Sequence, residues 1–254
     1  MKYSMSPLLA FAVDTAFRAG RATLPYFQTG VGRELKADRS PVTVADRTAE
    51  RIIREAIAAA YPDHGIYGEE EGETGPTDRR WVIDPIDGTK SFIAGVPLYA
   101  TLLSFEVDGQ VLVGVSAFPA LNEMVYAERG CGAFWDGRVA RVSVTPSLEG
   151  STVACGGHKS LLQYGRWEGM ARIAARAMTT RTWGDAYGHC LVATGRADAM
   201  IDPIVAPYDI SAIELIVREA GGTFTNFAGK SGRFAEAIST NGHVLDEVRE
   251  AFAG

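Results

Sequence analysis

The chain has 254 residues, 46% of them hydrophobic and 22% charged, with a formal net charge of −6 at pH 7. This composition excludes a disordered or fibrous chain and is typical of a globular protein with one large domain or two packed halves. The acidic balance and the lack of a Lys/Arg cluster argue against nucleic acid as a partner. The apolar segment 8–13 is too short to cross a membrane and is followed by Asp14, so we expect neither a membrane anchor nor a signal peptide.

Helical periodicity dominates the first sixty residues. Apolar residues recur at helical spacing over 8–28 and more clearly over 44–60, where Tyr61-Pro62 ends the second helix. Short strands are predicted next, over 81–83, 98–107, 111–118 and 124–127. Asp108-Gly109, between two of these strands, is typical of a hairpin turn.

The second half mixes helices and strands differently. The pattern predicts strands over 152–155, 199–201 and 223–225, and helices over 166–177, 185–194 and 210–220. This order favours layered α and β structure over a simple parallel doubly wound sheet, with a boundary near 140–150. The cysteines, Cys131, Cys155 and Cys190, form no CxxC pair, so we expect reduced thiols in a cytoplasmic protein rather than disulfides or a zinc site.

Three acidic clusters interrupt apolar segments, at 68–72, 81–89 and 207–210. Asp84 ends an apolar strand just before Pro85, where an unpaired buried carboxylate would be costly, and Asp87 follows three residues later. Two carboxylates this close repel each other unless a cation lies between them. Oxygen ligands without His or Cys nearby favour Mg²⁺ or Mn²⁺ over zinc. Gly88-Thr89 then opens a predicted helix, whose free N–H groups would suit a phosphate.

Each cluster also has a simpler interpretation. Asp209 alone is typical of a helix N-cap, and the segment 69–71 alone is typical of a solvated loop. Asp87-Gly88 alone is typical of a turn. Asp84 is the hardest to explain without a ligand, and the pattern by itself leaves a metal site and a purely structural role both open.

Two longer segments stand out: residues 81–92, WVIDPIDGTKSF, and residues 207–222, PYDISAIELIVREAGG. They resemble the signature and the second conserved element of the inositol monophosphatase superfamily of Mg²⁺-dependent phosphatases. Gly68-Glu69-Glu70 matches an upstream G-E-E, and Lys36 with 40–50 matches the N-terminal region, so the resemblance covers essentially the whole chain. It implies an α/β layered sandwich (α-β-α-β-α) and a homodimer. Residues 1–145 would carry most metal ligands, and residues 146–254 would carry Asp209 and the substrate contacts.

The resemblance also implies roles for individual residues. Two to three Mg²⁺ ions, or Mn²⁺, would be held by carboxylates and one carbonyl: Glu69, Asp84, Ile86, Asp87 and Asp209. Asp84 would bridge two ions, and a third, weaker ion would also use Glu69. Thr89, supported by Asp46, would help to activate the attacking water, with Glu69 also catalytic. The backbone N–H groups of Gly88 and Thr89 would hold the phosphate.

Two segments favour one branch of this superfamily. Lys-Ser-Phe follows Thr89, as in the bacterial histidinol-phosphate phosphatases, where inositol-specific members usually carry Thr-Asn-Phe. Gly184-Asp185-Ala186-Tyr187 stands where inositol members usually have G-T-A-A. The implied substrate is L-histidinol phosphate, whose ammonium group could pair with Asp185 in a charge-assisted hydrogen bond. Asp202 could accept from the amine or imidazole, and Tyr187 could pack near the ring.

Other interpretations remain at this point. Asp185 alone could be a helix N-cap following Gly184. An inositol-1-phosphate or broad sugar-phosphate phosphatase could use the same metal site. A non-catalytic binding protein of this fold is a different class, but the candidate set of acids is complete, whereas a protein without activity would be expected to have lost some of them.

Overall fold

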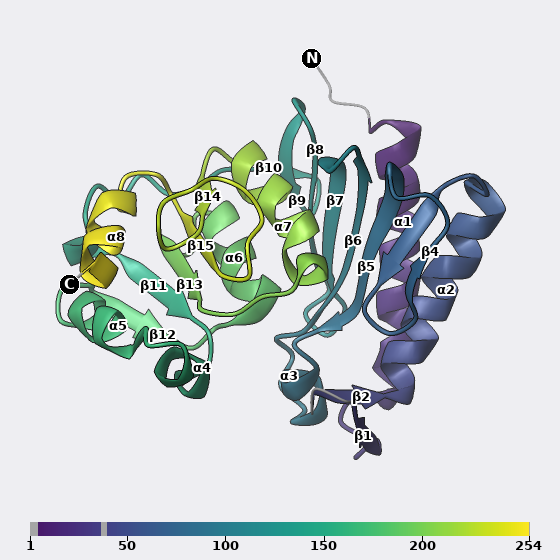
Figure 1. Ribbon diagram of the computed structural model, residues 1–254, viewed down its shortest axis with the longest axis horizontal. Coiled ribbons are helices and arrows are strands. Elements are labelled where there is room, and N and C mark those ends of the chain that lie inside the picture. Colours follow the sequence, from purple (N-terminus) through teal and green to yellow (C-terminus); the bar gives the residue numbers. More distant parts are fainter. Residues whose placement is uncertain (1–4, 37–39, 254) are drawn as a thin grey trace.

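The computed structural model describes residues 5–36 and 40–253, and it begins with two helices that lie side by side (Figure 1). Helix α1 (Pro7–Thr23) is capped by Ser6, and helix α2 (Val44–Ala60) by Thr43. The helix predicted over 44–60 is confirmed, whereas the one predicted over 8–28 ends at Thr23. Pro25 explains the early end, because its ring has no N–H and clashes with the preceding turn.

A sheet of eight strands lies against these two helices, in the order β10-β9-β8-β7-β6-β5-β3-β4. Its strands are β3 (Gly65–Gly68), β4 (Gly72–Thr74), β5 (Arg79–Asp87), β6 (Ala100–Val107), β7 (Gln110–Phe118), β8 (Glu123–Glu128), β9 (Gly132–Trp135) and β10 (Arg138–Ala140). Among the described strands of this sheet, only β3 and β5 pair in parallel. The β6–β7 turn uses Asp108 and Gly109 at positive φ, as the hairpin prediction requires.

A second sheet has five strands in the order β12-β11-β13-β15-β14. They are β11 (Thr152–Cys155), β12 (Thr179–Arg181), β13 (Ala199–Asp202), β14 (Thr223–Thr225) and β15 (Ala237–Thr240). Helices α6 (Asp185–Ala193) and α7 (Pro207–Glu219) lie between the two sheets. Helices α4 (His158–Gln163), α5 (Trp167–Ala174) and α8 (Leu245–Ala253) cover the outer face. The layers are therefore α-β-α-β-α, as predicted.

Alternation along the strands divides the core between these layers. Leu103 and Phe105 face α1 and α2, whereas Leu102 faces α6 and α7. Short elements border the open end between the sheets: β1 (Arg33–Leu35), β2 (Pro41–Thr43) and α3 (Thr89–Ile93). No helix among residues 5–36 and 40–253 is long and apolar enough to cross a membrane.

Helix α7 approaches the large sheet very closely at Gly114 of β7. A Cβ atom at Gly114 would lie 2.8 Å from the carbonyl oxygen of Ala212 and 3.0 Å from its Cα. Both of these are backbone atoms of a packed helix and cannot move aside alone. Glycine at this position thus sets how close α7 lies to the strands.

We expect Gly114→Ala to lower the free energy of unfolding by about 1–3 kcal/mol, because the added methyl overpacks a rigid contact. Gly32→Ala is the matched control, since a Cβ there meets no atom within 4 Å. Its effect should stay within about 0.5 kcal/mol. Urea unfolding of both variants checks this, and equal midpoints for the two would contradict the role of Gly114.

Candidate active site

The end of β5 carries two buried aspartates. Asp84 is 2% exposed and Asp87 is 7% exposed. Residues three apart on a regular strand point to opposite faces, but the pairing of β5 with β6 shifts register between Asp84 and Asp87. The strand does not stop at Pro85, as the sequence suggested; it continues irregularly to Asp87. This irregularity turns both carboxylates toward α7.

Asp209 joins them from the first turn of α7. One of its oxygens, Oδ2, accepts the backbone N–H of Ala206 at 2.7 Å. The N-cap role predicted for an isolated Asp209 is wrong, because α7 begins at Pro207, before Ile210. Ala206 is the N-cap, and Asp209, the third residue of the helix, reaches back to it as in a capping box. Oxygens of Asp84, Asp87 and Asp209 nevertheless all lie within 4.8 Å of one another. The structural and the metal-binding interpretations are therefore compatible, because a carboxylate has two oxygens.

No ion pair among residues 5–36 and 40–253 joins a cationic side chain to Asp84, Asp87 or Asp209, so the cluster gathers negative charge. Burial raises the pKa of Asp84 and Asp87 well above the usual range, and neighbouring carboxylates raise both further. The pKa of Asp209 rises to about 7, mainly through burial. Asp84 Oδ1 is buried and, within the described part of the chain, has no hydrogen-bond partner. An all-oxygen set with an unpartnered buried carboxylate fits a hard divalent cation.

Glu69 lies in the same pocket but outside this set of three. It follows β3, and its carboxylate pairs with the Lys36 ammonium at 2.8 Å. The turn that carries it is shaped by Glu50 of α2, a fully buried residue whose carboxylate accepts the N–H groups of Glu70 at 2.8 Å and of Glu71 at 3.1 Å. Sequence reasoning missed Glu50.

A signal for Glu50 was present in the sequence. The buried positions 46, 50, 53 and 57 of α2 follow helical spacing, so this acid falls on the apolar stripe.

Asp46 and Thr89 do not bond to each other. Asp46 Oδ2 accepts from the backbone N–H of Thr43 at 2.8 Å and from its hydroxyl at 2.6 Å, which forms the capping box of α2. Its Oδ1 has no partner among the described residues. The Thr89 hydroxyl donates to the Ile86 carbonyl at 3.1 Å. The Ile86 carbonyl therefore lies at the site, engaged by Thr89.

Gly88 is required by its surroundings. Its φ of 79° lies in the left-handed region, and a Cβ would lie 3.0 Å from the Leu98 carbonyl and 3.2 Å from Asp185 Oδ2. Thr89 then begins α3, and both residues line the pocket. A side chain here would be strained by the positive φ and would press on both neighbours.

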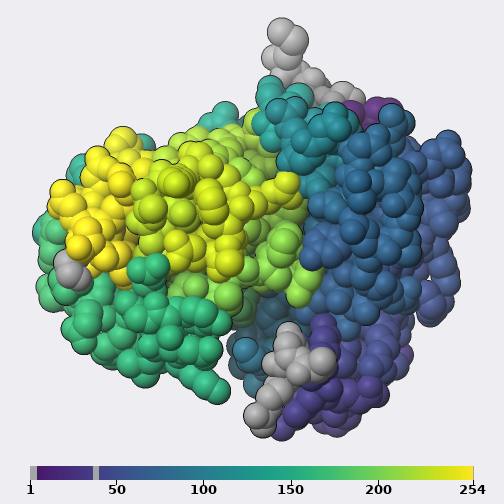
Figure 2. Space-filling model, viewed as in Figure 1, coloured from purple at the N-terminus to yellow at the C-terminus, as the bar shows by residue number. Residues whose placement is uncertain are grey.

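The pocket has a volume of about 640 Å³ and opens between the two halves of the chain. Figure 2 shows the surface hollowed there, between green atoms of the C-terminal half and blue atoms of the N-terminal half. Asp185 and Asp202 line it together with the acidic cluster. The backbone N–H of Ala186 donates to Asp87 Oδ2 at 2.7 Å, which joins the start of α6 to the end of β5.

Asp185 is not the N-cap of α6. Gly184 takes that position, and Asp185 has a φ of 57°, which is uncommon for a residue other than glycine. Asp185 is exposed on the pocket wall, but the protein atoms around it displace water and raise the pKa of its carboxyl, with Lys90 acting in the opposite direction. Asp202 is buried, and this burial raises its pKa. A cationic group in the pocket would meet both carboxylates.

The predicted position of Tyr187 near the substrate is wrong, and several residues that line the pocket were not predicted. The Tyr187 ring packs edge-on against Phe118 in the core at 5.2 Å and does not line the pocket. Lining residues without an expected role include Lys90, Lys159, Ile204 and His189. No sequence pattern marked Lys159 or Ile204, because each belongs to a short loop or helix whose position depends on the second sheet.

Comparison with known proteins places these features in context. The pattern of the inositol monophosphatase family matches residues 4–250. A histidinol-phosphatase of Chlorobaculum parvum is 44% identical over 89% of this chain and 88% of its own length. A fructose-1,6-bisphosphatase/inositol-1-monophosphatase of Thermotoga maritima is 40% identical, over 82% and 80%. The structure of an IMPase from Thermotoga maritima superposes with a TM-score of 0.90 at 33% identity, covering 97% of both chains. The chain belongs to the inositol monophosphatase family.

Proposed function

We propose that this protein is a Mg²⁺-dependent phosphatase that hydrolyses L-histidinol phosphate to L-histidinol and phosphate. The observation that carries the proposal is the convergence of Asp84, Asp87 and Asp209 beside a second acidic pair, Asp185 and Asp202, in one pocket. The first group suits a metal and a phosphate, and the second suits a cationic substrate tail. The similarity to a histidinol-phosphatase at 44% identity supports the same substrate.

The metal ions would be held by the predicted ligands, which are Glu69, Asp84, the Ile86 carbonyl, Asp87 and Asp209. Two to three Mg²⁺ ions per site are proposed, with Mn²⁺ as an alternative. Bound divalent ions lower the pKa of water and stabilise charge on the oxygens around phosphorus. The ion pair with Lys36 would hold the Glu69 carboxylate near the site in the absence of metal. To bind a metal ion, Glu69 would have to break this pair.

The chain's own groups position the phosphate and the water. We propose that the N–H groups of Gly88 and Thr89 bind phosphate oxygens, which Gly88 permits because it has no side chain. The Thr89 hydroxyl, oriented by its bond to the Ile86 carbonyl, would orient the attacking water. Asp46 would support Thr89 in this role through its unpartnered Oδ1. Phosphoryl transfer requires mainly such positioning and charge stabilisation.

The substrate's tail would be recognised by charge. The ammonium and imidazole of L-histidinol phosphate would meet Asp185 and Asp202, with the backbone of Gly184 and Ala186 beside them. An inositol-1-phosphate or broad sugar-phosphate phosphatase is the second candidate, supported by the 40% identity to the Thermotoga enzyme. A polyol offers no cation to this acidic pair, which favours the first candidate.

We further propose that residues 1–145 carry most of the metal ligands and that residues 146–254 carry Asp209 and the substrate contacts. We also propose that the protein is a cytoplasmic homodimer. It would act on a small soluble phosphomonoester and not on nucleic acid or membranes.

The substrate assignment predicts a kcat/KM for L-histidinol phosphate at least about 100-fold above that for inositol-1-phosphate, about 3 kcal/mol of differential transition-state binding. Asp185→Asn should reduce the value for histidinol phosphate about 10- to 100-fold and leave inositol-1-phosphate nearly unchanged. Asn tolerates the positive φ at this position, whereas a β-branched residue would be strained. Equal losses on both substrates would count against amine recognition.

Asp84→Asn should reduce phosphate release about 100-fold or more, since it halves the oxygen donors and removes the charge of the central ligand. EDTA should abolish the wild-type activity, and added Mg²⁺ should restore it. Asp136→Asn, an exposed aspartate outside the pocket, is the control and should behave as wild type. Activity that survives EDTA would contradict the metal mechanism.

The pH dependence of stability should also reveal metal binding. Without metal, folded Asp209 keeps its proton to about pH 7, whereas the unfolded chain loses it near 3.8. The unfolded state then binds fewer protons, so the free energy of unfolding should fall as pH rises through this window. Mg²⁺ should raise the melting temperature more at pH 8 than at pH 5, because protons compete for the same oxygens. Calorimetry with and without Mg²⁺ checks this, and a Mg²⁺ effect independent of pH would contradict it.

A further inference from the structure

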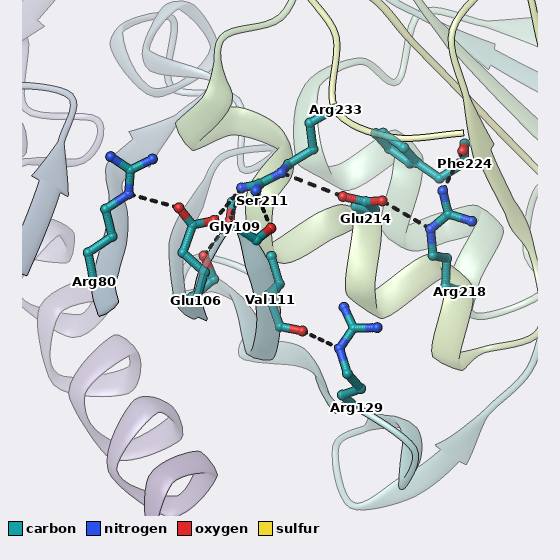
Figure 3. Close-up of polar contacts among 11 residues, drawn as sticks. Arg80, Glu106, Gly109, Val111, Arg129, Ser211, Glu214, Arg218, Phe224 and Arg233 are labelled. Atoms are coloured by element: carbon teal, nitrogen blue, oxygen red, sulfur yellow. Dashed lines mark hydrogen bonds and ion pairs between the residues drawn. The ribbon is translucent and has the colours of Figure 1, made fainter. Parts of the chain in front are cut away.

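A buried carboxylate on β6 joins parts of the chain that are far apart in sequence (Figure 3). The side chain of Glu106 is 2% exposed and accepts from Arg80 Nε at 2.8 Å and from Arg233 Nη1 at 2.5 Å. A carboxylate buried this deeply is stable only when it is paired, and loss of one partner leaves its charge uncompensated. Glu106 therefore holds the guanidinium of Arg233 in a defined place.

From that place Arg233 reaches α7. Its Nη1 donates to Ser211 Oγ at 3.2 Å, and its Nε lies 3.6 Å from Glu214 Oε2. Its Nη2 donates to the carbonyl of Gly109 in the β6–β7 turn at 2.7 Å. One guanidinium thus contacts the strand, the turn and the helix together (Figure 3).

A second bond supports the same attachment. Ser104 Oγ donates to Ser211 Oγ at 2.7 Å. Ser104 and Glu106 are two residues apart on β6 and face the same side of the sheet, toward α7. Ser211 is therefore tied to β6 directly and through Arg233.

This attachment lies close to the metal ligands. Ser211 follows Asp209 by two residues, about 3 Å along the helix axis. Asp84, the partner of Asp209, belongs to β5, whose Val82 pairs with Ser104 and whose Asp84 pairs with Leu102. A shift of α7 along the sheet would move Asp209 relative to Asp84 by the same amount, since a helix moves as a rigid unit.

We propose that Arg233 is a positioning residue for the divalent metal: its contacts with Glu106 and Ser211 set the place of Asp209 opposite Asp84. None of the sequence motifs includes Arg233 or Glu106. The inference rests on the metal site of the proposed function. Residues that orient metal ligands typically change metal affinity 10- to 100-fold when they are replaced.

Arg233→Met keeps an unbranched side chain as far as the position of Nε and removes the guanidinium with its charge and donors. The matched control is Arg218→Met, at the other end of α7. Arg218 also pairs with Glu214, at 3.1 Å, and donates to the Phe224 carbonyl at 2.8 Å. Both variants lose a partly buried ion pair with Glu214, but only Arg233 lies beside Ser211.

Mn²⁺ binding is measured on the full chain from the electron paramagnetic resonance signal of the free ion, beside the melting temperature without metal. Both variants should melt below the wild type. Arg233→Met should weaken Mn²⁺ binding about tenfold, whereas Arg218→Met should leave it unchanged. Arg233→Lys should recover part of the loss, because it keeps the charge but cannot reach every partner.

Equal Mn²⁺ affinity of Arg233→Met and wild type would overturn the proposal, as would equal weakening in Arg218→Met. If Arg233→Met does not fold, Ser211→Ala decides, since it removes only the hydroxyl that Arg233 and Ser104 share; severalfold weaker Mn²⁺ binding supports the proposal and unchanged binding overturns it. Wild-type protein that binds no Mn²⁺ overturns the metal site of the proposed function, and this inference with it. Tight Mn²⁺ binding without phosphatase activity would overturn the proposed function alone.

Discussion

The repulsion among three carboxylates, two buried at the end of β5 and one half-buried on α7, is the constraint on which the site depends. Asp84, Asp87 and Asp209 lie within 4.8 Å of one another with no cationic side chain in their set. Burial raises the pKa of such groups, and mutual repulsion raises it further. The surrounding fold must hold them together against that cost, which a compact, closely packed α7 and an irregular β5 can do. This arrangement fits a bound cation, whose positive charge would offset the repulsion.

The other buried acids show the contrast. Glu50 accepts two backbone N–H groups and Arg54, and Glu106 accepts two guanidinium groups. Asp198 accepts from Ser143 and from the Thr152 backbone. Within the described ranges, the buried carboxylate oxygens without a partner belong to Asp46 and Asp84, of which Asp84 lines the pocket. Native structures rarely leave such atoms unpaired, so the unpartnered oxygen of Asp84 is where a ligand is expected.

Local signals predicted the elements that need little help from neighbours. The amphipathic stripe of α2 and the Asp108-Gly109 turn were both found, because each depends on spacing or on positive φ within a few residues. Strands of three or four residues were mostly missed, namely β1, β2, β3, β4, β9, β10, β12 and β15, although β11, β13 and β14 were found. Strands this short have little pattern of their own and exist only through pairing with a neighbour. The continuation of β5 past Pro85 also depends on β6 beside it.

By itself, the sequence determined the motifs that contain Asp84, Asp87, Gly88 and Asp209, because each combines a strand or helix boundary with unusual residues. It could not determine which way a side chain turns once layers pack. The tertiary structure turned Tyr187 into the core and placed Asp185 against Gly88. It also brought Arg233 to Glu106, 127 residues away in sequence. The physical reason is that periodicity and capping act over one or two turns, whereas burial and ion pairing depend on segments that meet only when the two sheets and α7 pack together.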